Sequence, residues 1–152
     1  MKYRSRLALL ATTLLLSAAP CLAQQTAAAM CAGYADAAKW PADHDAVRAA
    51  PANHRVLYET DQIRVLEVTV APGERENLHH HRWPSVMVVD SRPPYTNYDK
   101  DGRVIPPALQ GPIEMPIAAR LPAQAEHAIE NTDAIRPFHA IRIEFKTLCQ
   151  PE

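Results

Sequence analysis

The chain has 152 residues, with 16 Lys and Arg against 17 Asp and Glu, so its formal net charge is −1 at pH 7. This balance leaves no basic surplus to attract a nucleic acid, so charge-driven nucleic-acid binding is excluded as a function. A chain of this length can bury the core of one domain and is too short for two substantial ones.

The first 23 residues have the pattern of a secretory signal peptide. Lys2, Arg4 and Arg6 precede an apolar run from Leu7 to Leu16, and small residues lead up to Ala23. The apolar run is too short for a membrane span, and no later segment is long or apolar enough. We therefore expect cleavage after Ala23 and a periplasmic or secreted protein without a transmembrane segment. Removing residues 1–23 leaves 13 basic and 17 acidic residues, a net charge of −4.

Two of the three cysteines, Cys31 and Cys149, lie in the expected mature chain, and Cys21 lies in the signal. In an oxidising compartment this pair predicts a disulfide that ties the N-terminal segment to the last strand. Closing a loop of that length would stabilise the fold by roughly 4 to 5 kcal/mol in the chain-entropy model. The alternative is a pair of free, buried thiols.

Residues 24–52 are interpreted as an Ala-rich arm packed on the outside of the domain. Pro41 and Pro51 interrupt this segment, and a short helix is expected over residues 27–39. His44 is flanked by two aspartates, and we interpret it as part of a solvated turn rather than a metal site.

Residues 53–148 are predicted to form a β-barrel, followed by a tail at 149–152. Pro and Gly turns separate short segments rich in β-branched and aromatic residues. This pattern, with little helix, predicts an all-β protein, either an antiparallel sandwich or a closed barrel, and a double-stranded jelly roll fits best. Besides an extended segment at 79–81, the expected strands are 55–59, 63–70, 85–90, 95–99, 103–105, 113–115, 118–121, 127–130 and 138–145.

Three consecutive histidines, His79 to His81, are followed 46 residues later by His127. Side chains alternate along a strand, so His79 and His81 share a face and His80 points the other way, outside the site. With His127 on a neighbouring strand, three imidazoles would form three corners of a coordination sphere and leave positions open for substrate. The predicted cofactor is one divalent ion, and imidazole does not decide between iron, zinc, manganese, nickel and copper.

These two segments resemble the paired motifs of the cupin superfamily, the RmlC-like jelly rolls. The first motif is a Gly, five residues and His-x-His, and the second is Pro-x-Gly-x-x-His-x-x-x-Asn. The matching residues are Gly73, His79 and His81 in the first motif and Pro122, His127 and Asn131 in the second. With its surrounding strands the match covers residues 55–146, and the resemblance implies a cupin barrel and suggests a homodimer.

Two positions depart from these motifs. Gln124 stands in place of the Gly of the second motif, and Ser85 stands where the first motif usually supplies a metal-binding Glu. Because a serine hydroxyl is a short and poor ligand for a divalent ion, three neutral imidazoles would leave the ion's full charge uncompensated. We therefore expect the site to favour a small anionic molecule.

The resemblance also implies a class of reaction. Cupins with a three-histidine site include iron-dependent dioxygenases of thiols and diketones, which favours a dioxygenase-like oxidation of a small anionic substrate. A lyase or isomerase that uses the same metal is an alternative. So are a binding module without turnover and a structural protein that has lost the chemistry.

Other side chains are candidates for the surroundings of the metal. Ser85, Trp83 and Gln124 are candidates for residues that contact the metal ligands or line the pocket, whereas His54 and His139 are interpreted as ordinary core or surface histidines. Three carboxylates could replace the missing Glu, although a solvated or salt-bridged role is favoured for each: Glu67, Glu76 and Glu126. Three arginines could pair with a substrate carboxylate, and the sequence does not select among them: Arg82, Arg120 and Arg142.

Overall fold

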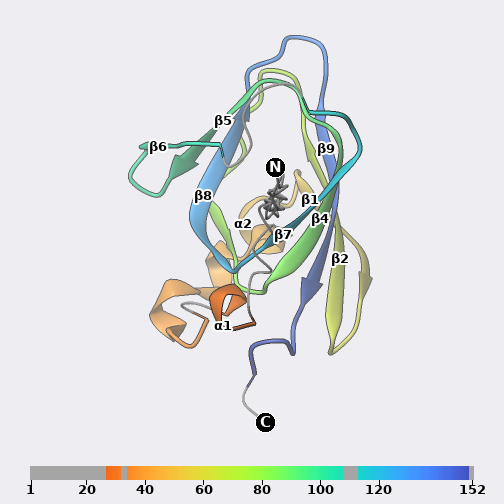
Figure 1. Ribbon diagram of the computed structural model, residues 1–152. Coiled ribbons are helices and arrows are strands. Elements are labelled where there is room, and N and C mark those ends of the chain that lie inside the picture. The colour runs from red at the N-terminus through yellow and green to blue at the C-terminus, as the bar shows by residue number, and fades with distance from the viewer. Residues whose placement is uncertain (1–26, 32–33, 108–112, 151–152) are drawn as a thin grey trace, which may run out of the picture.

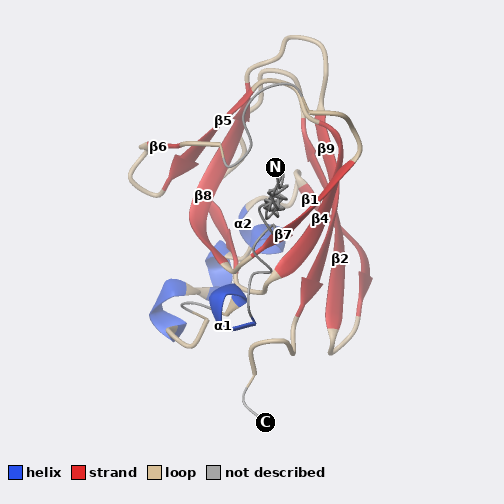
Figure 2. Cartoon of the chain, in the orientation of Figure 1, coloured by secondary structure: helices blue, strands red, loops and turns tan. Residues whose placement is uncertain are grey.

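Two antiparallel β-sheets face each other in this computed structural model, and a short helical arm lies at one end of them (Figures 1 and 2). The structure describes residues 27–31, 34–107 and 113–150, so the predicted signal at 1–23 lies outside them. The arm contains α1 (Ala27–Met30), η1 (Ala37–Lys39), η2 (Ala42–His44) and α2 (Ala46–Ala49). The two facing sheets confirm the predicted all-β class with a helical arm.

The strands form a five-stranded sheet in the order β1-β2-β9-β4-β7 and a four-stranded sheet in the order β3-β8-β5-β6. Strands that are distant in the chain therefore lie side by side, as β2 and β9 do. The strand bounds are β1 (His54–Glu59), β2 (Ile63–Val70), β3 (His79–His81), β4 (Ser85–Ser91), β5 (Tyr95–Asp99), β6 (Val104–Ile105), β7 (Ile117–Leu121), β8 (Gln124–Asn131) and β9 (Phe138–Phe145).

Two predicted elements are wrong. In the described part of residues 27–39, the expected helix ends at Met30 and a 3-10 helix follows at Ala37–Lys39. A short Ala-rich segment gains too little to offset the cost of helix nucleation. Residues 113–115 form no strand. Strand β7 begins instead at Ile117, directly after Pro116, whose nitrogen cannot donate a ladder hydrogen bond.

Buried and less buried residues alternate along both central strands, β2 and β9. On β2 the buried residues are Arg64, Leu66, Val68 and Val70, and on β9 they are Phe138, Ala140, Arg142 and Glu144. The strands pair so that Arg64 lies opposite Glu144 and Val70 lies opposite Phe138. The inner face of this sheet is therefore apolar towards one end and charged towards the other.

The arm is attached at the charged end of the sheet. The Asp45 carboxylate accepts a hydrogen bond from the Val47 amide and so caps α2, and it also accepts bonds from both terminal nitrogens of Arg64, at 2.8 and 3.0 Å. Cys31 and Cys149 lie at disulfide-bond distance, 2.07 Å between sulfurs, as the sequence predicts. Within the described part of the chain, no helix has the length and hydrophobicity of a membrane span.

Candidate metal centre

His79 on β3 and His127 on β8 are direct cross-strand partners, and their ring centroids are 4.6 Å apart. The His81 ring lies 5.0 Å from His79 and 5.6 Å from His127. The fold thus brings the three predicted histidines together, and all are at least 95% buried, with exposed fractions of 0, 2 and 5% for His79, His81 and His127. They form a buried group of imidazoles that could hold a metal ion.

A fourth histidine, His54, belongs to this group and was not expected there. It is the first residue of β1, and its ring centroid lies 4.5 Å from His79 and 5.2 Å from His81. His54 is a buried core histidine, and its place beside the predicted ligands makes it a further candidate ligand. It is separated in the chain from the His79–His81 run, and its place follows from the sheet order.

Each of the four rings bonds through Nδ1 to a protein oxygen. The acceptors are Ala50 O for His54, Asn77 O for His79, Glu144 Oε1 for His81 and Ala125 O for His127, at 3.2, 2.8, 2.8 and 2.9 Å. A carbonyl or carboxylate oxygen can only accept, so in the neutral rings the proton lies on Nδ1. The lone pair of each neutral ring then lies on Nε2, where a metal can bind, and the Nδ1 hydrogen bonds fix the ring orientation.

Two sets of three residues have all their candidate ligand atoms within 4.8 Å of one another. They are His54, His79 and His81, and Glu76, His79 and His127. His79 belongs to both sets, whereas His81 and His127 fall in different ones. Among the described residues, the His79 Nε2 and Glu76 Oε2 atoms are buried without a hydrogen-bond partner. A divalent cation would provide the partner that both atoms lack, so the donor set fits a metal.

Glu76 is a buried carboxyl group, 4% exposed, beside this cluster. One oxygen accepts a hydrogen bond from the Ile129 amide, and the same oxygen lies 3.9 Å from His79 Nε2. Of the three carboxylates considered as substitutes for the missing Glu, Glu76 is the one that reaches the histidines, and its burial excludes a solvated role. Glu67 pairs with Arg55, and Glu126 pairs with His44.

Burial dominates the electrostatics of the cluster. It lowers the pKa of His79 to about 4 and that of His127 to about 3, and it holds the pKa of His54 and His81 well below the ordinary value. It raises the pKa of Glu76 to about 8. All four imidazoles are therefore neutral at pH 7, the form that binds metals.

A chain of charged hydrogen bonds supports His81 from behind. Glu144 accepts from His81 Nδ1 at 2.8 Å through one oxygen and from Arg64 Nε at 2.6 Å through the other. Arg64 in turn bonds Asp45 of the arm. Because Glu144 and Arg64 are 0 and 5% exposed, little water competes for these bonds, and the arm is linked to a histidine of the cluster.

The histidines lie on the wall of a cavity of about 730 Å³ between the two sheets. Its other walls are largely apolar, and they include Val68, Met87, Val89, Ile117, Ile129 and Phe138. A mostly apolar cavity with a few convergent polar groups is the usual form of a small-molecule site. The cluster is thus placed where a bound molecule could reach it.

The three residues considered for the pocket wall have different positions. Gln124 lines the cavity and accepts a hydrogen bond from Arg142. No described residue other than glycine has a positive φ, so Gln124 avoids the left-handed conformation that Gly would adopt easily. Ser85 is fully buried but is not on the cavity wall, and Trp83 packs beneath Arg64, whose Cζ is 4.7 Å from its ring centroid.

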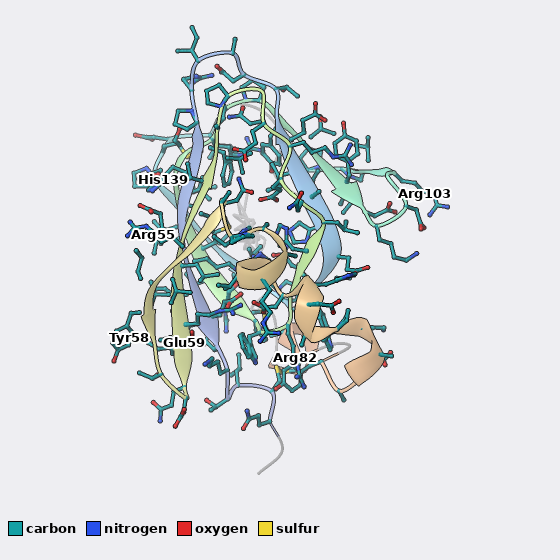
Figure 3. The ribbon with its side chains drawn as sticks, turned by 180° about the vertical axis from the view of Figure 1, so that it is seen from behind. Arg55, Tyr58, Glu59, Arg82, Arg103 and His139 are labelled. Atoms are coloured by element: carbon teal, nitrogen blue, oxygen red, sulfur yellow. A yellow bond between two sulfur atoms is a disulfide. The ribbon has the colours of Figure 1, made fainter. Side chains whose placement is uncertain are left out.

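The remaining histidines lie outside the cluster. His80 points away from His79 and His81 as predicted, but it is only 2% exposed, because its Nε2 bonds Pro41 O and its ring meets Trp40 of the arm. His139 forms ion pairs with Asp90 and Glu67. Figure 3 shows His139 on the outer side of the five-stranded sheet, as are Arg55 and Tyr58.

The flanks of the two histidine motifs hold each other. The Gly73 amide donates to Asn131 O and the Asn131 amide donates to Glu74 O, at 3.0 and 2.8 Å. Gly73 has φ +73°, a conformation that only Gly adopts at little cost. The Asn131 side chain donates to Val70 O and Arg136 O, so this motif residue has a structural role.

Comparison with solved structures shows which known fold this arrangement of sheets resembles. A cupin domain from Bordetella pertussis Tohama I superposes with a TM-score of 0.51 at 20% identity, over 61% of this chain and 91% of the other. The chain has the cupin fold. An RmlC-like cupin with a double-stranded β-helix fold from Methanocaldococcus jannaschii matches with a TM-score of 0.44 at 12% identity, over 60% of this chain and 77% of the other. No family model matches the sequence, and no curated protein is significantly similar to it. At these identities the likeness concerns the fold and not the reaction.

Proposed function

We propose that this cupin is an exported metalloenzyme that acts on a small anionic molecule by dioxygenase-like oxidation. One observation carries the proposal: four buried imidazoles, each with Nδ1 bonded to a protein oxygen, converge on the wall of an apolar cavity. Such ordered, neutral imidazoles are suited to a divalent metal, and the apolar walls would exclude water from a bound substrate.

His79 is the central ligand of the proposal because it belongs to both ligand sets. His81, His127 and His54 would complete the nitrogen donors, with Glu76 as the one nearby carboxylate. A redox-active metal bound here would supply the activation of dioxygen, and a zinc or manganese ion would instead polarise a carbonyl for a lyase or isomerase reaction. The chain itself orients the imidazoles through their Nδ1 bonds and provides the apolar walls.

The metal site is tested by elemental analysis of the mature protein, which is expressed with its own signal sequence and isolated after export. We expect about one transition metal per chain and a near-complete loss of it in His79→Ala, with weaker binding in His54→Ala, His81→Ala and His127→Ala. The matched control is His139→Ala, because this histidine lies outside the cluster. A metal content in His79→Ala equal to that of the parent would refute the site.

Oxygen uptake in the presence of small thiols, diketones and carboxylates tests the reaction. Consumption that needs both the metal and the organic compound supports an oxygenase. Tight binding without product would identify a non-catalytic module, and product without oxygen uptake would identify a lyase or isomerase. Export and homodimerisation stay predictions. Cell fractionation with N-terminal sequencing tests export, and analytical ultracentrifugation tests homodimerisation.

A further inference from the structure

Arg142 is a buried arginine on the wall of the cavity. It lies on β9, is 2% exposed, and donates from Nη1 to Gln124 Oε1 at 2.6 Å. Among the described residues, its Nε and Nη2 atoms have no hydrogen-bond partner. A guanidinium carries five N–H donors, and leaving them unbonded in a buried site is costly. The side chain therefore has donors to spare for a ligand.

The neighbouring carboxylates are already used by other groups. Arg142 Nε lies 3.5 Å from Glu144 Oε1, but that oxygen accepts from His81, and the other oxygen accepts from Arg64. Glu76 Oε1 accepts from the Ile129 amide. No described carboxylate hydrogen-bonds to Arg142, so its buried charge lacks a bidentate partner. A carboxylate that enters the cavity could supply one.

Arg142 is also distinguished from the other two arginines that the sequence singles out. Arg82 lies against the ring of Tyr34, with its Cζ 5.0 Å from the centroid, and is not part of the cavity wall. Arg120 lines the cavity but is exposed to solvent. Arg142 alone of the three is both buried and on the wall, where an ion pair is least screened by water.

We propose that Arg142 binds the carboxylate of an apolar monocarboxylic acid in this cavity, with Gln124 as the residue that positions the guanidinium. The ligand's apolar body would pack on the cavity walls, which include Met87, Ile129 and Phe138. The inference deepens the proposed function and rests on it for the use of the acid as substrate, but the binding step itself requires no metal.

Calorimetric titration of chelator-treated, metal-free protein tests the binding step, with benzoate as probe and benzyl alcohol as its neutral counterpart. We expect benzoate to bind at least about tenfold more tightly than benzyl alcohol, in line with a desolvated charge-assisted pair. Arg142→Gln should remove this preference, and Arg142→Lys should reduce it, because an ammonium cannot form the bidentate pair. The control, Arg55→Gln, should keep the preference because Arg55 lies on the outer side of the five-stranded sheet, away from the cavity.

Equal binding of benzoate and benzyl alcohol by the parent protein would overturn the inference, as would unchanged benzoate binding in both Arg142 variants. Because the first comparison uses the parent protein, a folding defect in a variant does not remove the test. Gln124→Leu is a second check, since it should weaken benzoate binding while Arg142 is retained. Benzoate binding by a protein that holds no metal after reconstitution would refute the proposed function alone, and metal binding without benzoate binding would refute this inference alone.

Discussion

Glu144 accepts a hydrogen bond from His81 Nδ1 at 2.8 Å in a site where the two residues are 0 and 2% exposed. The same carboxylate accepts from Arg64, so one residue orients a histidine of the cluster and neutralises a buried arginine. Ser85 stands where the cupin motif usually has its metal-binding Glu. The structure instead places two other carboxylates near the histidines, Glu144 behind His81 and Glu76 beside His79.

Replacing this carboxylate should affect both metal binding and stability. In Glu144→Gln we expect metal affinity to fall about 10- to 100-fold, because a neutral amide oxygen is a weaker acceptor for His81 Nδ1 than the carboxylate that orients the ring. We also expect the free energy of unfolding to fall by roughly 3 kcal/mol, because Arg64 loses a buried ion-pair partner. Metal titration and urea denaturation measure the two effects. Glu59→Gln is the matched control, since Glu59 is an exposed carboxylate of β1 that pairs with Lys146 and not with the histidine cluster.

The metal-free protein should lose stability when the pH falls below about 6.5. Burial lowers the pKa of His79 to about 4 and that of His127 to about 3, from 6.5 in the unfolded chain. At a pH between the folded and the unfolded pKa of each histidine, the unfolded chain binds a proton that the folded chain does not, so acid favours unfolding. At pH 5 we expect a loss of roughly 2 kcal/mol for each of these histidines relative to pH 7.

Urea denaturation at several pH values, with a chelator present, measures this loss. In His127→Ala the loss should be smaller, because one of the contributing groups is gone. Equal free energies of unfolding at pH 5 and pH 7 in the parent protein would contradict the prediction.

Glu76 should have the opposite effect at higher pH. Burial raises its pKa to about 8 from 4.5, so the folded chain keeps a proton that the unfolded chain releases. Its contribution to stability is complete below pH 4.5 and is lost as the pH rises through about 8. Between about pH 7.5 and 8, where the unfolded histidines with their pKa of 6.5 take up few protons, the free energy of unfolding should fall by up to about 1.4 kcal/mol per pH unit. Glu76→Gln should remove this slope, and a slope that persists in the variant would show that another group causes it.

The disulfide should contribute strongly to stability. Cys31 and Cys149 are 118 positions apart, and opening a loop of this length should lower the free energy of unfolding by roughly 4 kcal/mol. The measurement is urea denaturation of the double variant Cys31→Ser, Cys149→Ser beside the parent protein, with and without a reducing agent. The reducing agent should destabilise only the parent. If the parent and the double variant unfold at the same urea concentration under oxidising conditions, the bridge does not stabilise the fold.

Local patterns in the sequence were enough for the fold class and for part of the cluster. Alternation along a strand indicates which residues share a face, so the pairing of His79 with His81 and the exclusion of His80 follow from period-two geometry alone. Turn residues and β-branched runs likewise predict most of the strands, including β2 and β9.

Only the tertiary structure decided the rest. His54 and Glu76 join the histidines, and Glu144 and Arg142 lie behind and beside them, because sheet order and strand register bring separate strands together. Nothing in the local spacing of these four residues encodes that register. The sequence by itself thus determined an all-β chain with a histidine pair and an expected third ligand. The packing of two sheets and an arm determined which other charges share the cavity, since burial and proximity depend on the whole fold.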